Sequence, residues 1–230
     1  MKPQELRTAR LEKGWGQTEV AARLGVSQPY VNMLEKGKRR LTSEMAHKLA
    51  KVYSFSPVEL PVSEAFKPLK VDAQHLAESL AKLDYPGFAY LRSHVTKKNP
   101  GEVLVTALFQ NSLEARVAEA LPWLMLKYWQ MDSDWLVEEA RKLNLQNRLG
   151  FVVNLARYVS EKNSQNAQRL HALSELEATL NTSRLANEDA FYRPPRTVGE
   201  REWLLQNRSD AARHWNLLTD LRPEDLQYVD

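Results

Sequence analysis

Two acidic side chains have a spacing that could support catalysis. Asp132 and Asp134 form an Asp-x-Asp pair, with which an enzyme could hold a divalent metal for nucleotide transfer. The Gly-Ser turn expected upstream of such a pair is missing. Asp132 and Ser133 stand instead where a helix is expected to begin, and both residue types cap helix N-termini. Helix capping therefore explains the pair better than catalysis.

The other residue types that commonly do chemistry lack the spacing of a known site. The sequence has no cysteine, which excludes disulfides, thiolate catalysis and Cys-based zinc sites. It also has no phosphate-loop, dinucleotide-binding or Gly-x-Ser-x-Gly pattern. The histidines show no ligand spacing: His47, His75, His94, His171 and His214. We therefore predict no enzyme activity, no metal site and no cofactor.

Basic side chains are concentrated near the N-terminus. Residues 1–70 contain 13 Lys and Arg against 7 Asp and Glu, a balance of +6, whereas residues 71–230 contain 19 against 22, a balance of −3. The basic part includes the run Lys36-Gly37-Lys38-Arg39-Arg40. A basic module on a mildly acidic body is typical of a nucleic-acid reader with a second function. Charge alone fits a solvated surface equally well.

Short helices separated by glycines are expected in this basic part. Apolar periodicity predicts helices over residues 3–13, 17–24 and 28–36, ended by Gly14, Gly25 and Gly37. In the first of these helices, Leu6, Ala9 and Leu11 fall on the helical period, and Gly25 is expected to adopt a left-handed backbone conformation. Ser27 is a suitable N-cap for the third helix. Two further helices are expected, at 42–53 and from Ser56 onward, which makes five. The second and third helices, joined through a turn that contains Gly25, form a helix-turn-helix unit.

Residues 6–60 resemble the xenobiotic-response-element family, the helix-turn-helix fold of phage repressors and Cro proteins. The matching residues are in register without a gap: Leu6, Arg10, Gln17, Val20, Ala21, Gly25, Val26, Ser27, Val31, Leu34, Glu35, Gly37, Leu49 and Ala50. The resemblance implies a DNA-binding domain of about 60 residues. It also implies a partly buried ion pair between Arg10 and Glu35 that ties the first helix to the third; the alternative is two unrelated surface charges.

In this fold the second helix of the unit enters the major groove, and its first residues read base edges. The predicted base-contacting residues are Ser27, Gln28, Asn32 and Met33, of which Gln28 is the main specificity residue. The predicted phosphate contacts are Gln17, Lys36, Lys38, Arg39, Arg40 and Tyr30. Tyr30 could instead pack against the first helix.

The sequence pattern predicts helices in the rest of the chain as well. Residues 61–72 contain two prolines and no periodicity, so we place a linker there. Residues 73–230 are predicted to form a separate helical bundle, with helices starting near Asp72, Asn99, Ser112, Ser133, Leu145, Ser164, Thr197 and Ser209. Regularly spaced leucines from Leu170 to Leu185 fit an ordinary bundle helix better than a coiled-coil seam. The fold class is all-α.

Two functions fit this organisation. The first is a dimeric transcriptional repressor that binds an inverted repeat in double-stranded DNA. The second is an antitoxin that represses its own operon and neutralises a toxin through residues 73–230. The apolar residues of that domain would equally serve homodimerisation, a ligand cavity or a protein-binding groove. No apolar run is long enough for a membrane span, so we expect a cytoplasmic protein.

Overall fold

The computed structural model describes residues 1–63, 66–92, 94–163 and 166–228. In this part of the chain it contains twelve α-helices and two strands of two residues each, which confirms the all-α class. The chain divides into two compact units, residues 1–65 with 97–99 and residues 66–96 with 100–230. The boundary between 65 and 66 falls inside the predicted linker 61–72, of which residues 64 and 65 lie outside the described part.

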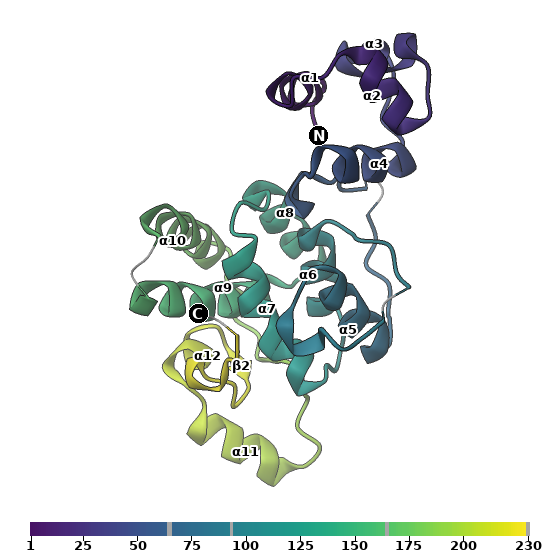
Figure 1. Cartoon of the computed structure of the whole chain (residues 1–230). Coiled ribbons are helices and arrows are strands. Elements are labelled where there is room, and N and C mark those ends of the chain that lie inside the picture. Colours follow the sequence, from purple (N-terminus) through teal and green to yellow (C-terminus); the bar gives the residue numbers. More distant parts are fainter. Residues whose placement is uncertain (64–65, 93, 164–165, 229–230) are drawn as a thin grey trace. The chain divides into compact units, whose positions relative to one another are not determined.

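The first unit consists of four short α-helices and a single 3-10 turn (Figure 1). The elements are α1 (Pro3–Glu12), α2 (Gln17–Leu24), α3 (Gln28–Glu35), α4 (Ser43–Tyr53) and η1 (Pro57–Glu59). Their buried apolar residues recur at helical spacing and meet in one core: Leu6, Ala9, Val20, Ala21, Leu24, Val31, Leu34, Met45, Leu49 and Tyr53. The hydroxyl of Thr42 accepts a hydrogen bond from the amide of Met45 and so caps α4.

Two expectations for this unit were wrong. Leu11 falls on the apolar period of the first helix, but its side chain is exposed. The fifth helix is reduced to η1, because Leu60 precedes Pro61 and adopts an extended conformation, with φ −60° and ψ 135°. A residue before proline is disfavoured in the helical region, since the proline ring clashes with its backbone. The helix opened by Ser56 therefore ends after one turn.

Residues 97–99 join the first unit although they are distant in sequence. The side-chain amide of Asn99 donates to the carbonyls of Val58, at 3.1 Å, and Leu60, at 2.7 Å. The carbonyl of Lys97 lies 2.6 Å from Nε2 of His47. The sequence had indicated Asn99 only as a helix cap, and these contacts explain why the short segment belongs with η1 and α4.

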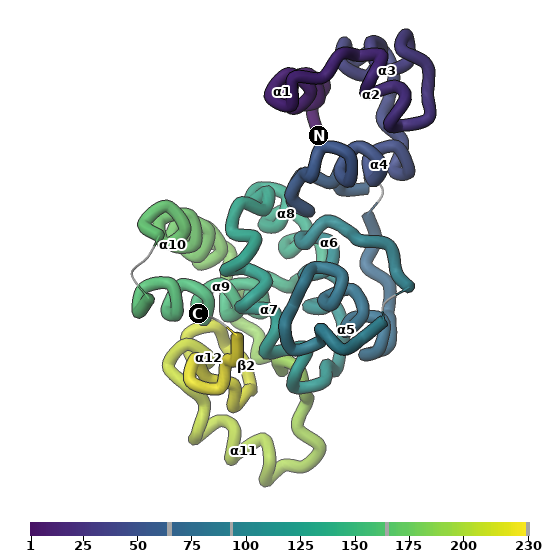
Figure 2. Tube along the Cα trace, viewed as in Figure 1, coloured from purple at the N-terminus to yellow at the C-terminus, as the bar shows by residue number. Residues whose placement is uncertain are grey.

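The second unit holds the remaining helices, and several of them pack against a buried central helix, α9 (Gln146–Asn163). The others are α5 (Ala73–Lys82), η2 (Pro86–Phe88), α6 (Pro100–Leu108), α7 (Ala115–Lys127), α8 (Ser133–Leu143), α10 (Ala167–Asn181), α11 (Val198–Asn207), α12 (Asp210–His214) and η3 (Pro223–Asp225). Residues 149–153 of α9 are all buried, so this helix is surrounded on every side. Figure 2 shows α10 running beside α9.

Close packing against α9 depends on a glycine. A Cβ placed on Gly150 would lie 2.4 Å from the indole ring of Trp215, a contact that real side chains do not make. Trp215 is fully buried and follows α12 directly. Glycine at position 150 therefore lets the fully buried indole of Trp215 rest on the backbone of α9.

A two-residue parallel ladder was not predicted. β1 (Asp189–Ala190) pairs with β2 (Leu217–Leu218), in the register Asp189 to Leu217. Arg148 on α9 holds this ladder, since its guanidinium donates to both carboxylate oxygens of Asp189, at 2.6 and 2.8 Å. Strands this short carry no alternating pattern, so the sequence could not reveal them.

Most predicted helix starts in the second unit agree with the structure. The side chains of Asp72, Asp132, Thr197 and Ser209 each accept a hydrogen bond from a backbone amide of the first turn of the helix that follows. The helix predicted from Ser112 begins three residues later, at Ala115. The start predicted at Ser164 lies outside the described residues. The leucine-rich α10 buries Leu173, Leu176 and Leu180, as an ordinary bundle helix does.

Candidate nucleic-acid interface

The turn between α2 and α3 is built around Gly25. Its φ of +70° is left-handed, and its amide caps α2 through the carbonyls of Ala21 and Ala22. A Cβ at this position would meet nothing within 4 Å, so the backbone conformation, not lack of space, requires glycine. Ala21 is buried. This turn fixes the direction in which α3 leaves α2.

A bidentate ion pair ties α1 to α3. Nε of Arg10 lies 2.6 Å from Oε1 of Glu35, and Nη2 lies 3.0 Å from Oε2. Both residues are only 8% exposed, and the third guanidinium nitrogen, Nη1, donates to the carbonyl of Trp15 at 2.9 Å. These are the two residues that the family resemblance paired. Their contact holds α3 against the rest of the unit.

The interactions within the pair favour the ionised form of both side chains. Burial raises the pKa of Glu35, but the hydrogen bonds from Arg10 and Gln17 outweigh it and hold that pKa below its usual value. The same hydrogen bond to Glu35 raises the pKa of Arg10 against the opposing effect of burial. The pair is therefore ionised at neutral pH.

A chain of side-chain amides continues from this ion pair to the start of α3. The amide nitrogen of Gln17 donates to Oε2 of Glu35 at 2.9 Å, and its carbonyl oxygen accepts from Nε2 of Gln28 at 2.6 Å. Both functional groups of the Gln17 side chain are thus occupied within the protein. What Gln17 can offer a phosphate is its backbone amide, at the first position of α2.

The predicted base-reading residues lie at the beginning and middle of α3. Ser27 is exposed, while Gln28, Asn32 and Met33 are half-buried. Ser27 occupies the N-cap position with an extended backbone, but its hydroxyl accepts no hydrogen bond from α3. The predicted N-cap position is thus confirmed, without a capping bond from the side chain. The Ser27 hydroxyl is consequently not committed to the helix.

The basic run after α3 is fully on the surface. Lys36, Lys38, Arg39 and Arg40 are all exposed. The guanidinium carbon of Arg39 lies 5.5 Å from the centre of the Tyr30 ring, within the range of a cation–π contact. Tyr30 is half-buried against the core of the unit, so part of its side chain packs and part is accessible. Gly37, at φ +67°, turns the chain away from α3.

An aromatic cluster beside the ion pair of Arg10 and Glu35 was not predicted from the sequence. The Trp15 ring stacks on Tyr53 with centres 6.0 Å apart, and the guanidinium of Arg23 lies 4.1 Å above Trp15. Burial raises the pKa of Tyr53 to about 12. Trp15 lies in the loop between α1 and α2, Arg23 lies on α2 and Tyr53 ends α4, so no local pattern could have indicated the cluster.

The residues considered for catalysis do not form a site. Oδ1 of Asp132 accepts from the amide of Trp135 at 3.0 Å, which is the expected cap of α8. Among the described residues, no group of three or more His, Asp or Glu side chains could hold a metal ion. No helix in the same residues is both long and apolar enough to cross a membrane.

Comparison with known proteins supports the reading of the first unit. The helix-turn-helix family model matches residues 6–60. A Sinorhizobium fredii protein named uncharacterized HTH-type transcriptional regulator y4dJ is 47% identical over 51 residues, which are 22% of this chain and 66% of that protein. The match thus spans slightly less than two thirds of that relative. No solved structure matches the chain. Residues 6–60 are a helix-turn-helix domain of the phage-repressor-like type.

Proposed function

We propose that the protein regulates transcription by binding double-stranded DNA, with α3 in the major groove. The observation that supports this proposal is that α3 is held in place while its accessible face carries side chains that can bond to base edges. The ion pair of Arg10 and Glu35 and the bond between Gln17 and Gln28 hold α3 in place. Ser27, Gln28 and Asn32 stand along its first two turns, where this motif reads bases.

Gln28 is the proposed specificity residue. Nε2 of Gln28 donates to the side chain of Gln17, and this hydrogen bond orients the Gln28 side chain before DNA is bound. A glutamine amide can pair with N6 and N7 of adenine, and a held side chain loses less conformational freedom on binding. Asn32, one turn further along α3, offers the same pair of groups.

Phosphate binding is assigned to two places on either side of this face. One is the N-terminus of α2, where the backbone amide of Gln17 and the helix dipole favour an anion. The other is the exposed basic run, with Lys36, Lys38, Arg39 and Arg40. Contacts of this kind position a protein on DNA and contribute most of its salt-dependent affinity.

The finer proposal is a repressor that binds an inverted repeat as a dimer. One helix-turn-helix unit contacts only half a site, and two-fold pairing sets half-sites about 10 to 10.5 base pairs apart. In this proposal, two copies of the protein associate through their second units. Footprinting of the full-length protein on DNA selected from a random pool tests this: two protected half-sites are expected, and a single protected half-site would contradict the dimer.

The assignment of Gln28 is tested by comparing Gln28→Ala with Gln4→Ala, which removes the same side chain from an exposed site on α1. Gln28→Ala should cost about 1 to 3 kcal/mol on the selected sequence and relax preference at one base pair. Gln4→Ala should leave both unchanged. Equal loss on selected and random DNA would mean that α3 does not read bases.

Lys38→Ala should weaken binding to selected and random DNA alike. The slope of log K against log salt should fall by about one unit, because one fewer counterion is released. Lys51→Ala, an exposed lysine on α4, is the matched control. An unchanged slope for Lys38→Ala, with the slope of Lys51→Ala reduced, would move the phosphate contact to α4.

A further inference from the structure

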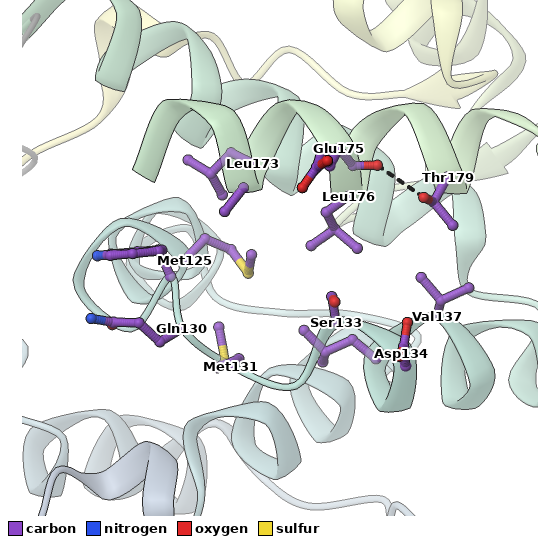
Figure 3. Close-up of a pocket in the computed structure, with 13 residues that line it drawn as sticks. Met125, Gln130, Met131, Ser133, Asp134, Val137, Leu173, Glu175, Leu176 and Thr179 are labelled. Atoms are coloured by element: carbon purple, nitrogen blue, oxygen red, sulfur yellow. Dashed lines mark hydrogen bonds between the residues drawn. The ribbon is translucent and has the colours of Figure 1, made fainter. Parts of the chain in front are cut away.

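A cavity of about 440 Å³ lies within the second unit, between the end of α7, the beginning of α8 and one face of α10. In Figure 3, Leu173 and Leu176 extend from α10 towards Met125, Met131 and Ser133 on the opposite side. The volume is within the range of about 300 to 1,000 Å³ that small-molecule sites occupy. Size alone therefore allows a compact organic ligand.

One part of the cavity lining is apolar and adaptable. It is formed by Met125, Met131, Leu173 and Leu176, each of which is at least nine-tenths buried. Methionine side chains are flexible and polarisable, so they fit ligands of irregular shape. Trp129 also lines the cavity. Its indole ring adds area for an apolar or cationic group.

The charged groups of the cavity all have the same sign. Asp134 comes from α8 and Glu175 from α10, and none of the described residues that line the cavity is Lys, Arg or His. Asp134 makes no ion pair within the described part of the chain. Glu175 lies 3.4 Å from Nε2 of His171, an exposed side chain of the same helix that does not line the cavity. An anionic ligand would meet uncompensated repulsion here.

We propose that this cavity binds a small amphiphilic cation, with an apolar body inside and a positive group between Asp134 and Glu175. Burial of the apolar body supplies affinity, and the two carboxylates supply the preference for positive charge. Ser133 and Thr179 line the same cavity, and their hydroxyls provide acceptors for an ammonium group. This inference concerns the second unit alone and does not depend on DNA binding.

Two ions of the same shape and opposite charge give a direct test. Tetraphenylphosphonium and tetraphenylborate would be titrated calorimetrically into the full-length protein without DNA, at about 0.15 M salt, where the Debye length is about 8 Å. Tetraphenylphosphonium should bind at least about tenfold more tightly than tetraphenylborate. Equal binding of the two ions, or no binding of the cation, would overturn the proposal.

Substitutions test whether the two ions bind in this cavity. Asp134→Asn with Glu175→Gln keeps the shape of the side chains and should weaken the cation about tenfold while improving the borate. Glu138→Gln removes one charge from the same helix outside the cavity and should leave both affinities unchanged. Ala172→Phe narrows the cavity without changing charge and should weaken both ions. Thermal unfolding of each variant checks folding, and wild-type affinity in both the charge and filling variants would overturn the proposal.

Discussion

Ion pairs join elements in both units, but the two units differ in the contact at their centre. In the first unit, α1 and α3 are joined by a buried ion pair, and the same bonds continue to Gln28 on the proposed DNA-reading face. In the second unit, the central contact is an indole ring on the bare backbone of Gly150. The bonds that hold the helices of the first unit therefore also orient the proposed DNA-reading side chains, whereas the packing of Trp215 on Gly150 in the second unit involves none of the residues that line the proposed ligand cavity.

The largest expected effect is in the second unit. Trp215→Ala should lower the free energy of unfolding by about 4 kcal/mol, because a fully buried indole is lost and a cavity remains beside α9. Chemical denaturation measures the total loss. Hydrogen exchange with mass spectrometry, resolved by peptide, should show that amides of α9 and α12 lose protection while those of α1 to α4 do not.

The matched control is Trp203→Ala on α11. That side chain is 53% exposed, so its loss should change stability by less than about 0.5 kcal/mol. Loss of protection in both units after Trp215→Ala would show that the units unfold together, and the contrast between them would then fail as a description of stability.

The second effect is in the first unit. Arg10→Ala should destabilise it by about 3 kcal/mol, because Glu35 is left charged and buried without its partner. Arg7→Ala removes an exposed arginine from the same helix and is the control. Arg10→Ala should also weaken binding to selected DNA, since α3 loses its tie to α1. A loss below about 0.5 kcal/mol would mean that the pair contributes no more than an exposed one.

Acid should weaken the same pair to a smaller extent. The pKa of Glu35 is lowered in the folded protein from an ordinary value of 4.5, so its contribution to stability is present above that pH and is lost as pH falls below it. Urea unfolding at about pH 7 and about pH 3.5 should show a larger loss in the wild type than in Glu35→Gln. Equal losses would show that other groups account for the acid sensitivity of this unit.

Sequence reasoning succeeded where one local signal fixes one local structure. Gly25 required a left-handed backbone, and Asp132 and Thr197 accept the amide bonds expected of helix caps. It failed where distant residues decide. Leu11 fits a helical period but has nothing to pack against, and the side-chain bond between Gln17 and Gln28 joins two helices. The cavity lined by Met125 and Leu176 likewise exists only after three helices meet.

The smallest expected effects come from one substitution at two glycines. Gly25→Ala should destabilise the first unit by about 1 kcal/mol, because its φ of +70° strains any residue with a Cβ although the space around it is open. Gly199→Ala, in the first turn of α11, should stabilise the second unit by about 0.5 kcal/mol, because it has equal space, lacks a positive φ, and alanine loses less entropy in a helix. Thermal unfolding with peptide-resolved exchange assigns each change to its unit. Changes in stability of opposite sign would show that backbone conformation alone distinguishes the two sites. A loss of stability at Gly199 as large as that at Gly25 would show that backbone conformation is not the cause.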